Sequence, residues 1–319
     1  MPRTRLAPSP TGALHLGNAR TFLITWALAR QNGWNIVLRI EDLDGPRVKK
    51  DAAAEAIEDL QWLGLDWDEG PIYQRYDLAP YQDALRKIAS AGLAYPCECT
   101  RQQIQAATLS APHGDEHELR YPGTCRPRRS DNSPKFKLTD ADFSQAWRLV
   151  VPDGAIGVCD QFCGHREFDV QQTIGDFLIW TKQGLPSYQL AVVVDDARQG
   201  IDQVIRGDDL LSSAARQQIL YDRLELGTYP AYTHLPLVVG LDGRRLAKRH
   251  GDSRISKYRQ KGVSATRVLG LLARWSGLAN VTEISADEFR TQFRLSNLSS
   301  ERATFSNEDE HWLWDRSKR

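Results

Sequence analysis

The chain has 319 residues, enough to bury a sizeable core and to form two or three subdomains. Hydrophobic residues make up 41% and charged residues 26%, which excludes a disordered chain, a collagen and a coiled coil. Because 41 Lys and Arg balance 41 Asp and Glu, the net charge gives no support for a nucleic-acid partner, which must be argued from local patches.

Alternating strands and helices are predicted over about the first ninety residues. A short strand at residues 5–7 is followed by turn residues and by a helix with apolar side chains at helical spacing. A nearly continuous apolar run predicts a strand at Asn35–Ile40, covered on both faces. Two more helices are expected, from about Asp51 to Gly64 and from Asp77 to Gly92. This order favours an α/β fold with a doubly wound parallel sheet.

The rhythm changes between Cys97 and about Phe168, where prolines, glycines, histidines and charges replace the periodic pattern and predict an insertion. After it we expect a helix near 169–181, a buried strand at Leu190–Val194, a helix from about 208 to 226, and a strand at Leu235–Val239. Beyond Gly262 apolar residues at helical spacing predict a helix. Four parts follow: 1–96 and 169–262 as the two halves of the doubly wound domain, 97–168 as the insertion, and 263–319 as a short helical region.

Two segments suit a nucleotide, although the chain has neither a dinucleotide fingerprint nor a P-loop. His15-Leu16-Gly17-Asn18 opens the first helix, where a glycine permits close approach and the helix N-terminus attracts phosphate. Arg244 to Gly251, after the last predicted strand, is a basic loop that suits a polyphosphate. Taken alone, the first segment could be only a helix cap and the second only a solvated basic loop. The occurrence of both in one chain favours a nucleotide site.

The pairing resembles the HIGH and KMSKS motifs of the class I aminoacyl-tRNA synthetases. Neighbouring segments are similar to the glutamyl branch of that family: RLAPSPTG at 5–12, RIEDLD at 39–44, LAVVVDD at 190–196 and RGDDL at 206–210. The resemblance covers about residues 3–275 and implies a Rossmann-like catalytic domain. The chain departs from the motifs at Asn18, Arg245 and Ala247 but retains Lys248, so we expect activity with a slower activation step.

The resemblance implies roles for individual residues. ATP is assigned to His15, Gly17, Asn18 and Lys248, with His15, Asn18 and Lys248 catalytic and Mg²⁺ accompanying the nucleotide. L-Glutamate is assigned to Arg5, Ala7, Ser9, Glu41, Tyr188 and Arg206. Arginine can bind a carboxylate bidentately, and an acidic residue at a strand end suits the ammonium group. The alternatives are surface ion pairs for both arginines and a salt bridge from Glu41 to Arg39.

Cys97, Cys99 and Cys125 lie in the insertion, whose low apolar content suggests that a metal stabilises it. By resemblance to the shorter glutamyl-queuosine enzymes, Tyr121 completes the ligand set of one structural Zn²⁺. Some glutamyl-tRNA synthetases use a histidine where this chain has Pro127. The alternatives are His113 or His117 as fourth ligand, cysteines without metal, and a rival site at Cys159, Cys163 and His165, although we interpret those two cysteines as small buried residues.

The chain ends about seventy residues after Lys248, too few for the anticodon-binding region of full glutamyl-tRNA synthetases, so residues 263–319 resemble only the start of a stem-contact region. The resemblance therefore implies the glutamyl-queuosine branch. These enzymes activate glutamate with ATP without tRNA and transfer it to the queuosine base in the anticodon of tRNA(Asp). The alternatives are a truncated glutamyl-tRNA synthetase charging tRNA(Glu), a small-molecule nucleotidyltransferase and a non-catalytic tRNA-binding paralogue.

Binding of tRNA is expected to rely on local cations at Arg126, Arg128, Arg129, Arg249 and Lys257. The five cysteines suit a reducing compartment, the apolar stretches are too short to cross a bilayer, and the amino terminus has no signal-peptide region. We therefore expect a cytoplasmic monomer without a membrane partner.

Overall fold

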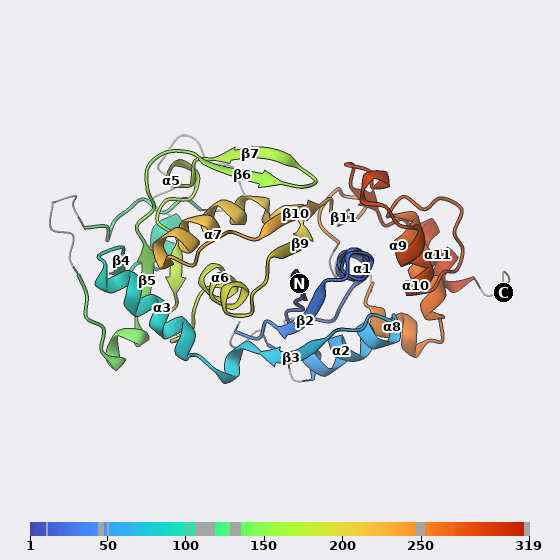
Figure 1. Ribbon diagram of the computed structural model, residues 1–319, viewed down its shortest axis with the longest axis horizontal. Helices are drawn as coiled ribbons and strands as arrows, with labels where there is room; N and C mark the ends of the chain where they lie inside the picture. The colour runs from blue at the N-terminus through green and yellow to red at the C-terminus, as the bar shows by residue number, and fades with distance from the viewer. Residues whose placement is uncertain are drawn as a thin grey trace.

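The computed structural model shows a central set of parallel strands wrapped by helices, with an antiparallel sheet at one end and the C-terminal helices at the other (Figure 1). No helix among the described residues is long and apolar enough to cross a membrane. The structure describes residues 1–10, 12–43, 48–49, 51–100, 102–105, 119–127, 135–246 and 253–315.

The N-terminal third forms a three-stranded parallel sheet in the order β1 (Arg3–Leu6), β2 (Asn35–Ile40) and β3 (Glu69–Tyr73). Helix α1 (Leu16–Asn32) connects the first two strands. The connection to β3 contains helix α2 (Ala52–Trp62), and α3 (Ala79–Ser90) follows β3. These elements confirm the predicted alternation of strand and helix in this part of the chain.

A second sheet has the order β7-β6-β10-β9, built from β6 (Ile156–Asp160), β7 (Gly164–Phe168), β9 (Gln203–Gly207) and β10 (Ala231–Leu235). Strands β6, β10 and β9 are parallel, and β7 is antiparallel to β6. The Asp202 amide, just before β9, donates to the carbonyl of Arg3 at 3.1 Å. Strand β9 therefore lies beside β1, and the carboxyl ends of β1, β2 and β9 meet at one edge, where doubly wound folds bind ligands.

A third sheet is antiparallel and lies at the end of the molecule opposite the C-terminal helices (Figure 1). Its strands are β4 (Ala94–Cys97), β5 (Ala146–Leu149) and β8 (Leu178–Trp180). Most of its apolar side chains belong to a large core shared with α3 and with helices α6 (Tyr188–Arg198) and α7 (Leu211–Leu224). Helix α7 confirms the helix predicted between about 208 and 226.

Three predicted elements are wrong. Leu190–Val194 is not a strand but part of α6, and every residue from Gln189 to Asp196 is buried. A helix buried on all sides shows no polar face, and its β-branched valines favour a strand in the sequence. The helix expected near 169–181 is reduced to α5 (Val170–Thr173) and is followed by β8. Pro236 interrupts the expected 235–239 strand, which becomes the end of β10 and a short β11 (Val238–Val239).

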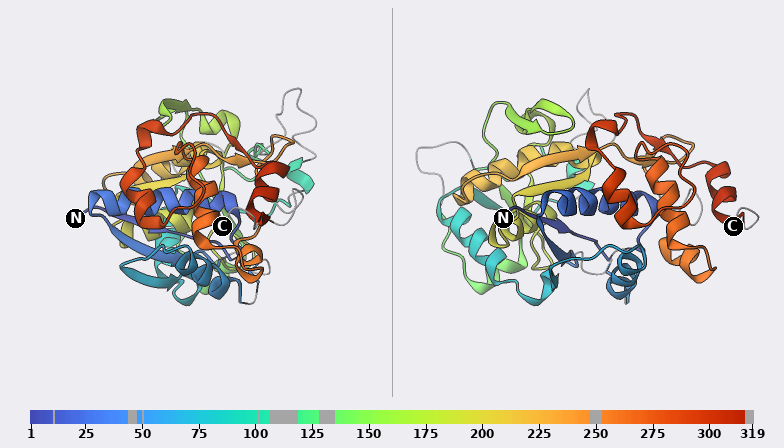
Figure 2. Two further views of the ribbon diagram at one scale, coloured as in Figure 1. Left: turned by 90° about the vertical axis from the view of Figure 1, so that its right-hand side faces the viewer. Right: turned by 45° about the vertical axis from the view of Figure 1, so that its right-hand side comes forward.

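The C-terminal region packs against the N-terminal third, so the two ends of the chain share one apolar core (Figure 2). Its elements are α8 (Ile255–Gln260), α9 (Ala265–Arg274), α10 (Ala286–Gln292), β12 (Ala303–Thr304) and α11 (Asn307–Trp314). Helix α9 confirms the helix predicted beyond Gly262. Strand β12 pairs in parallel with β11, and helix α1 lies against α9 and α10.

The last helix is held by stacked cations and indoles. The guanidinium groups of Arg267 and Arg274 lie 4.6 and 4.0 Å from the Trp312 ring, and Lys257 and Lys261 approach Trp314. Such contacts bury the aliphatic stems of the cations as well as the rings. This arrangement places Leu313 in the core shared with the N-terminal strands.

Candidate active site and metal cluster

A cavity of about 470 Å³ lies at the edge where β1, β2 and β9 end. It brings together residues from the start of the chain, from α6 and from the strand that precedes α7. All the residues predicted to bind glutamate line it, together with three of the four predicted to bind ATP: Arg5, Ala7, Ser9, His15, Gly17, Asn18, Glu41, Tyr188 and Arg206. The fourth, Lys248, lies outside the described residues.

His15 is the N-cap of α1, and its ring turns back onto the first turn of the helix. Its Nδ1 accepts a hydrogen bond from the backbone amide of Asn18 at 3.4 Å. Burial, and then the positive charge of Arg245, lower the pKa of His15 to about 4. The neutral ring therefore carries its proton on Nε2 and presents a donor rather than a charge. A Cβ at Gly17 would lie 3.2 Å from this ring, so the glycine leaves the ring room.

The described start of the basic loop and the residues just after it are fixed beside the start of α1. The amide of Leu246 donates to Val238, and after the loop the amide of Leu16 donates to Ser253, each at 3.0 Å. The amide of Ile255 donates to Leu14 at 2.8 Å. These contacts bring the described flanks of the two predicted motifs together; Ala247 and Arg249, like Lys248, are not among the described residues.

The two arginines predicted to bind glutamate are buried. Arg5 and Arg206 are each 5% exposed, which excludes the alternative of surface ion pairs. Arg5 faces Asp196 at 3.5 Å and donates to the carbonyl of Ile205. The Nη1 atom of Arg206 is buried without a hydrogen-bond partner. Because an unpaired buried donor is costly, this end of the cavity suits an anionic ligand.

Glu41 satisfies both interpretations drawn from the sequence. Its carboxylate makes the salt bridge to Arg39 at 3.2 Å, and the residue also lines the cavity. Burial raises the pKa of Glu41, while Arg39 and Arg5 oppose that shift. One carboxylate can thus neutralise a buried arginine and face the ammonium group of a substrate.

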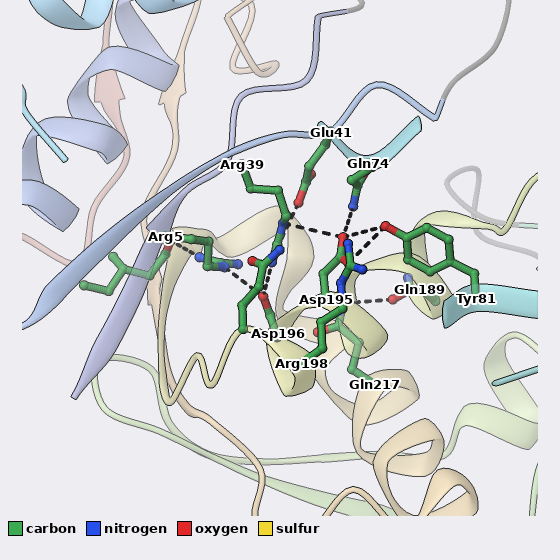
Figure 3. A network of polar contacts seen from close by, with 12 residues as sticks. Arg5, Arg39, Glu41, Gln74, Tyr81, Gln189, Asp195, Asp196, Arg198 and Gln217 are labelled. Carbon is green, nitrogen blue, oxygen red and sulfur yellow. Dashed lines mark hydrogen bonds and ion pairs between the residues drawn. The ribbon is translucent and has the colours of Figure 1, made fainter. Parts of the chain in front are cut away.

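Two aspartates beneath the cavity were missed as functional residues. Asp196 pairs with fully buried Arg39 at 2.8 Å as well as with Arg5, and Asp195 accepts hydrogen bonds from Tyr81 and Gln74 (Figure 3). Their sequence signal was two adjacent carboxylates ending an apolar run, in the segment taken for a strand. Buried carboxylates of this kind are found with paired cations, and here Asp196 sets the position of Arg5.

The three cysteines of the insertion form a cluster. The Sγ atoms of Cys97, Cys99 and Cys125 lie within 4.8 Å of one another, the only such group of potential ligands among the residues the structure describes. The Tyr121 hydroxyl lies 3.5 Å from Cys97 Sγ and 3.9 Å from Cys99 Sγ. Three thiols and a phenol around one point fit a four-coordinate Zn²⁺. His113 and His117 fall outside the described ranges.

Arg148 on β5 adds a positive charge to this cluster. Its Nε donates to Cys97 Sγ at 3.3 Å, and its guanidinium lies 3.8 Å from the centre of the Tyr121 ring. Its Nη1 donates to the carbonyl of Asp176, which fixes its orientation. A metal bound by several thiolates carries excess negative charge, which a cation at this position would offset.

The remaining cysteines differ from expectation. Cys159 is exposed and Cys163 half-buried, so the prediction of two buried small residues is wrong for Cys159. Cys159 Sγ lies 3.6 Å from Nδ1 of His165. Neither cysteine belongs to a group of three or more potential ligands within the described part of the chain.

Two of the cationic side chains expected to bind tRNA form ion pairs within the protein. Arg126 pairs with Asp176 at 3.2 Å, and Lys257 pairs with Glu310 at 3.1 Å. Both side chains are less than one-fifth exposed. They are therefore not the free surface cations that the sequence suggested, and Arg128 and Arg129 lie outside the described residues.

The fold and the cavity agree with the comparison to known families. The model of the catalytic domain of the class I tRNA synthetases (E and Q) matches residues 2–312. The chain therefore belongs to this family and is a ligase with the class I catalytic fold. This membership argues against the alternative of an unrelated small-molecule nucleotidyltransferase.

Individual relatives indicate which branch of the family the chain resembles most. The chain is 43% identical to Glutamyl-Q tRNA(Asp) synthetase of Symbiobacterium thermophilum over 309 residues, which are 93% of this chain and 94% of that relative. It is 35% identical to Glutamate–tRNA ligase of Heliobacterium modesticaldum over 98% of this chain but 64% of that relative. Within the class I family, the chain belongs with the glutamyl-Q tRNA(Asp) synthetases.

A solved structure supports the fold. The glutamate tRNA ligase from Elizabethkingia meningosepticum, solved in complex with its amino acid, superposes with a TM-score of 0.78 at 27% identity. The match covers 98% of this chain and 68% of that one.

Proposed function

We propose that the enzyme activates L-glutamate with ATP in the absence of tRNA and transfers the glutamyl group to queuosine in the anticodon of tRNA(Asp). The observation that carries the first part is the composition of the cavity. Arg5, Arg206 with its unpaired buried Nη1, and Glu41 lie at one end, and the start of α1 lies at the other. Two cations and one anion match the two carboxylates and one ammonium of glutamate.

In the activation step, a glutamate carboxylate oxygen attacks the α-phosphorus of ATP and pyrophosphate leaves. His15, uncharged and donating from Nε2, binds a phosphate oxygen at the N-terminus of α1. Lys248 from the basic loop follows the charge that moves onto the leaving pyrophosphate, and Mg²⁺ accompanies the nucleotide. Charge pairing selects glutamate over glutamine, because a neutral amide cannot form the same ion pair with arginine.

In the transfer step, a hydroxyl of the queuosine cyclopentenediol attacks the adenylate carbonyl and AMP leaves. The two carboxylates in the described lining are already paired, Glu41 with Arg39 and Asp209 with Arg245. We assign neither as general base, and positioning of the hydroxyl carries this step. An anticodon arm is a short A-form stem with single-stranded bases that can be splayed into a pocket. The preference for this acceptor over tRNA(Glu) rests on the higher identity to the glutamyl-Q relatives, at 43% against 35%.

The cysteine cluster holds one structural zinc in this proposal. Cys97, Cys99, Cys125 and Tyr121 are its ligands, and bound zinc would tie β4 to the loop that contains Tyr121. The metal has no part in the chemistry, because none of its four ligands lines the cavity.

Acylation with labelled glutamate tests the acceptor. Purified tRNA(Asp) carrying queuosine should accept glutamate, and tRNA(Asp) lacking queuosine should accept none. Removing the 3′-terminal adenosine should leave acceptance by the modified tRNA intact. Glutamate on the 3′ end of tRNA(Glu) would establish the alternative, a glutamyl-tRNA synthetase activity.

A further inference from the structure

A buried line of three side chains leads from the β6–β7 hairpin to the glutamate end of the cavity. Nε of Arg206 donates to Nε2 of His234 at 2.9 Å, and Nδ1 of His234 lies 2.6 Å from a carboxylate oxygen of Asp160. His234 is fully buried and Asp160 is 7% exposed. Neither His234 nor Asp160 lines the cavity.

The chemistry of the three groups fixes the proton positions. A guanidinium group only donates, so Nε2 of His234 must carry a lone pair and the ring proton must be on Nδ1. That proton is donated to Asp160. The ring is therefore a neutral acceptor for Arg206, in the one tautomer that the carboxylate selects.

Asp160 is itself held in place. One carboxylate oxygen accepts the backbone amides of Phe162 and Cys163 at 3.0 and 2.7 Å, which leaves the other for the ring of His234. Although burial opposes its ionisation, hydrogen bonds from His234 and Cys163 keep the pKa of Asp160 below its ordinary value. The carboxylate is thus charged and immobile.

We propose that His234 and Asp160 are positioning residues for glutamate, which hold the plane of the Arg206 guanidinium so that its unpaired Nη1 serves the substrate. With Nε bound to His234 and Nη2 within 3.4 Å of the Leu210 carbonyl, Nη1 is the nitrogen left for a substrate carboxylate. This inference rests on the proposed activation of glutamate. Without the acceptor on His234, the guanidinium would lose the partner that fixes its orientation.

A matched pair of substitutions tests the acceptor. His234→Gln places an amide oxygen near the position of Nε2, whereas His234→Met has nearly the same shape and no strong acceptor. In glutamate-dependent pyrophosphate exchange, His234→Met should raise KM for glutamate about tenfold and leave KM for ATP unchanged. His234→Gln should stay within about threefold of the wild type, since an acceptor remains. Equal effects of both variants, or parallel changes in both KM values, would overturn the proposal.

Asp160→Asn tests the tautomer. The amide oxygen should keep the backbone amides, so the NH₂ group faces Nδ1 and drives the ring proton onto Nε2, against the Nε–H of Arg206. KM for glutamate should rise as in His234→Met. In the double variant Asp160→Asn with His234→Met, KM should equal that of His234→Met, because no ring is left whose proton could be misplaced. An additive loss in the double variant would contradict the tautomer argument.

Val204→Ala is the control for lost packing, because Val204 lies on β9, the strand that carries Arg206, and is fully buried. This substitution should lower stability without changing the ratio of KM for glutamate to KM for ATP. Calorimetric titration of glutamate gives the same comparison without catalysis, and the unfolding midpoint of each variant shows whether it is folded. A wild-type protein without glutamate-dependent exchange would refute the proposed function. An active wild type whose glutamate affinity is unchanged in folded His234→Met and Asp160→Asn would refute this inference alone.

Discussion

The glutamate end of the cavity and the cysteine cluster both join distant parts of the chain, but they are held together differently. The cavity residues stand at strand ends over large apolar cores, and Arg5 is fixed by Asp196 beneath it. The cluster rests on an apolar group whose fully buried members are Tyr95, Cys97 and Tyr121. Apolar cores and buried ion pairs shape the first region. The second has little buried apolar surface, and in our proposal a bound metal orders it.

Removal of the metal should separate the two regions most clearly. A structural zinc contributes on the order of 10 kcal/mol to the folding of small metal-binding segments. Chelation, or Cys97→Ser, should expose the loop that contains Tyr121 to limited proteolysis while glutamate-dependent pyrophosphate exchange persists. Metal analysis should find one zinc per chain in the wild type and in the control Cys159→Ser, whose thiol is exposed and outside the cluster. A zinc-free protein with the same protease resistance would show that the cluster folds unaided.

The converse change is Asp196→Ala, which should damage the cavity and spare the metal. It leaves Arg39 and Arg5 without their shared buried carboxylate, at a cost of about 3–5 kcal/mol in the free energy of unfolding. Urea titration measures this loss, and zinc content should not change. Asp83→Ala breaks an exposed pair with Arg86 and should cost less than about 1 kcal/mol. Similar costs for both variants would argue against the buried network.

Lys248→Ala should impair activation without changing either scaffold. Loss of its contact with the phosphates should cost about 3 kcal/mol of transition-state stabilisation, roughly a hundredfold in pyrophosphate exchange. Lys135→Ala, an exposed lysine outside the cavity lining, is the control. Full activity of Lys248→Ala would remove the basic loop from the mechanism.

The cavity should also respond to pH through His15. The pKa of this ring is about 4 in the folded protein and near its ordinary value when unfolded, so the unfolded chain takes up the proton first. The contribution to stability is complete above about pH 6.5 and falls as pH drops toward 4, by at most about 3 kcal/mol. His15→Gln should lack this slope in denaturant titrations at several pH values. Identical slopes for both proteins would show that His15 is not kept neutral by the fold.

The smallest effect is expected at Arg148, which lies beside the proposed zinc ligands without being one of them. Arg148→Met removes the charge next to Cys97 and Tyr121 and should lower zinc affinity about 10–100-fold. Competition with a chromogenic chelator measures the affinity, and Arg148→Lys should recover part of it. Unchanged zinc affinity in Arg148→Met would show that Arg148 contributes only packing at this site.

The sequence was more informative about the residues that line the cavity or form the cysteine cluster than about the residues that hold them in position. Arg5, Glu41 and Arg206 were assigned through the resemblance to the family's motifs, and their charges at strand ends agreed with that assignment. The cysteines were singled out by their place in the insertion, and the resemblance added Tyr121. Asp195 and Asp196 were overlooked because the helix that carries them is buried on every side and shows no periodicity.

Arg148 and His234 were out of reach for a different reason. Each acts through strand pairing, of β5 with β4 and of β10 with β9, and the register of those pairs is not written in either strand alone. Residue type and spacing identify groups that meet a ligand, while contacts one layer behind them require the three-dimensional fold.

The shared core of the two chain ends has a consequence for synthesis on the ribosome. Leu6 and apolar residues of α1 share a core with Phe289, Phe305 and Leu313, which are made long after them. The other large core runs from Val37 to Tyr232 and lacks these late residues, so its members are all available earlier. Vectorial translation therefore completes the middle of the protein before its beginning. The core beneath the strand that carries Arg5 is complete only once Leu313 has been made, and until then a nascent chain exposes apolar surface for chaperones to cover.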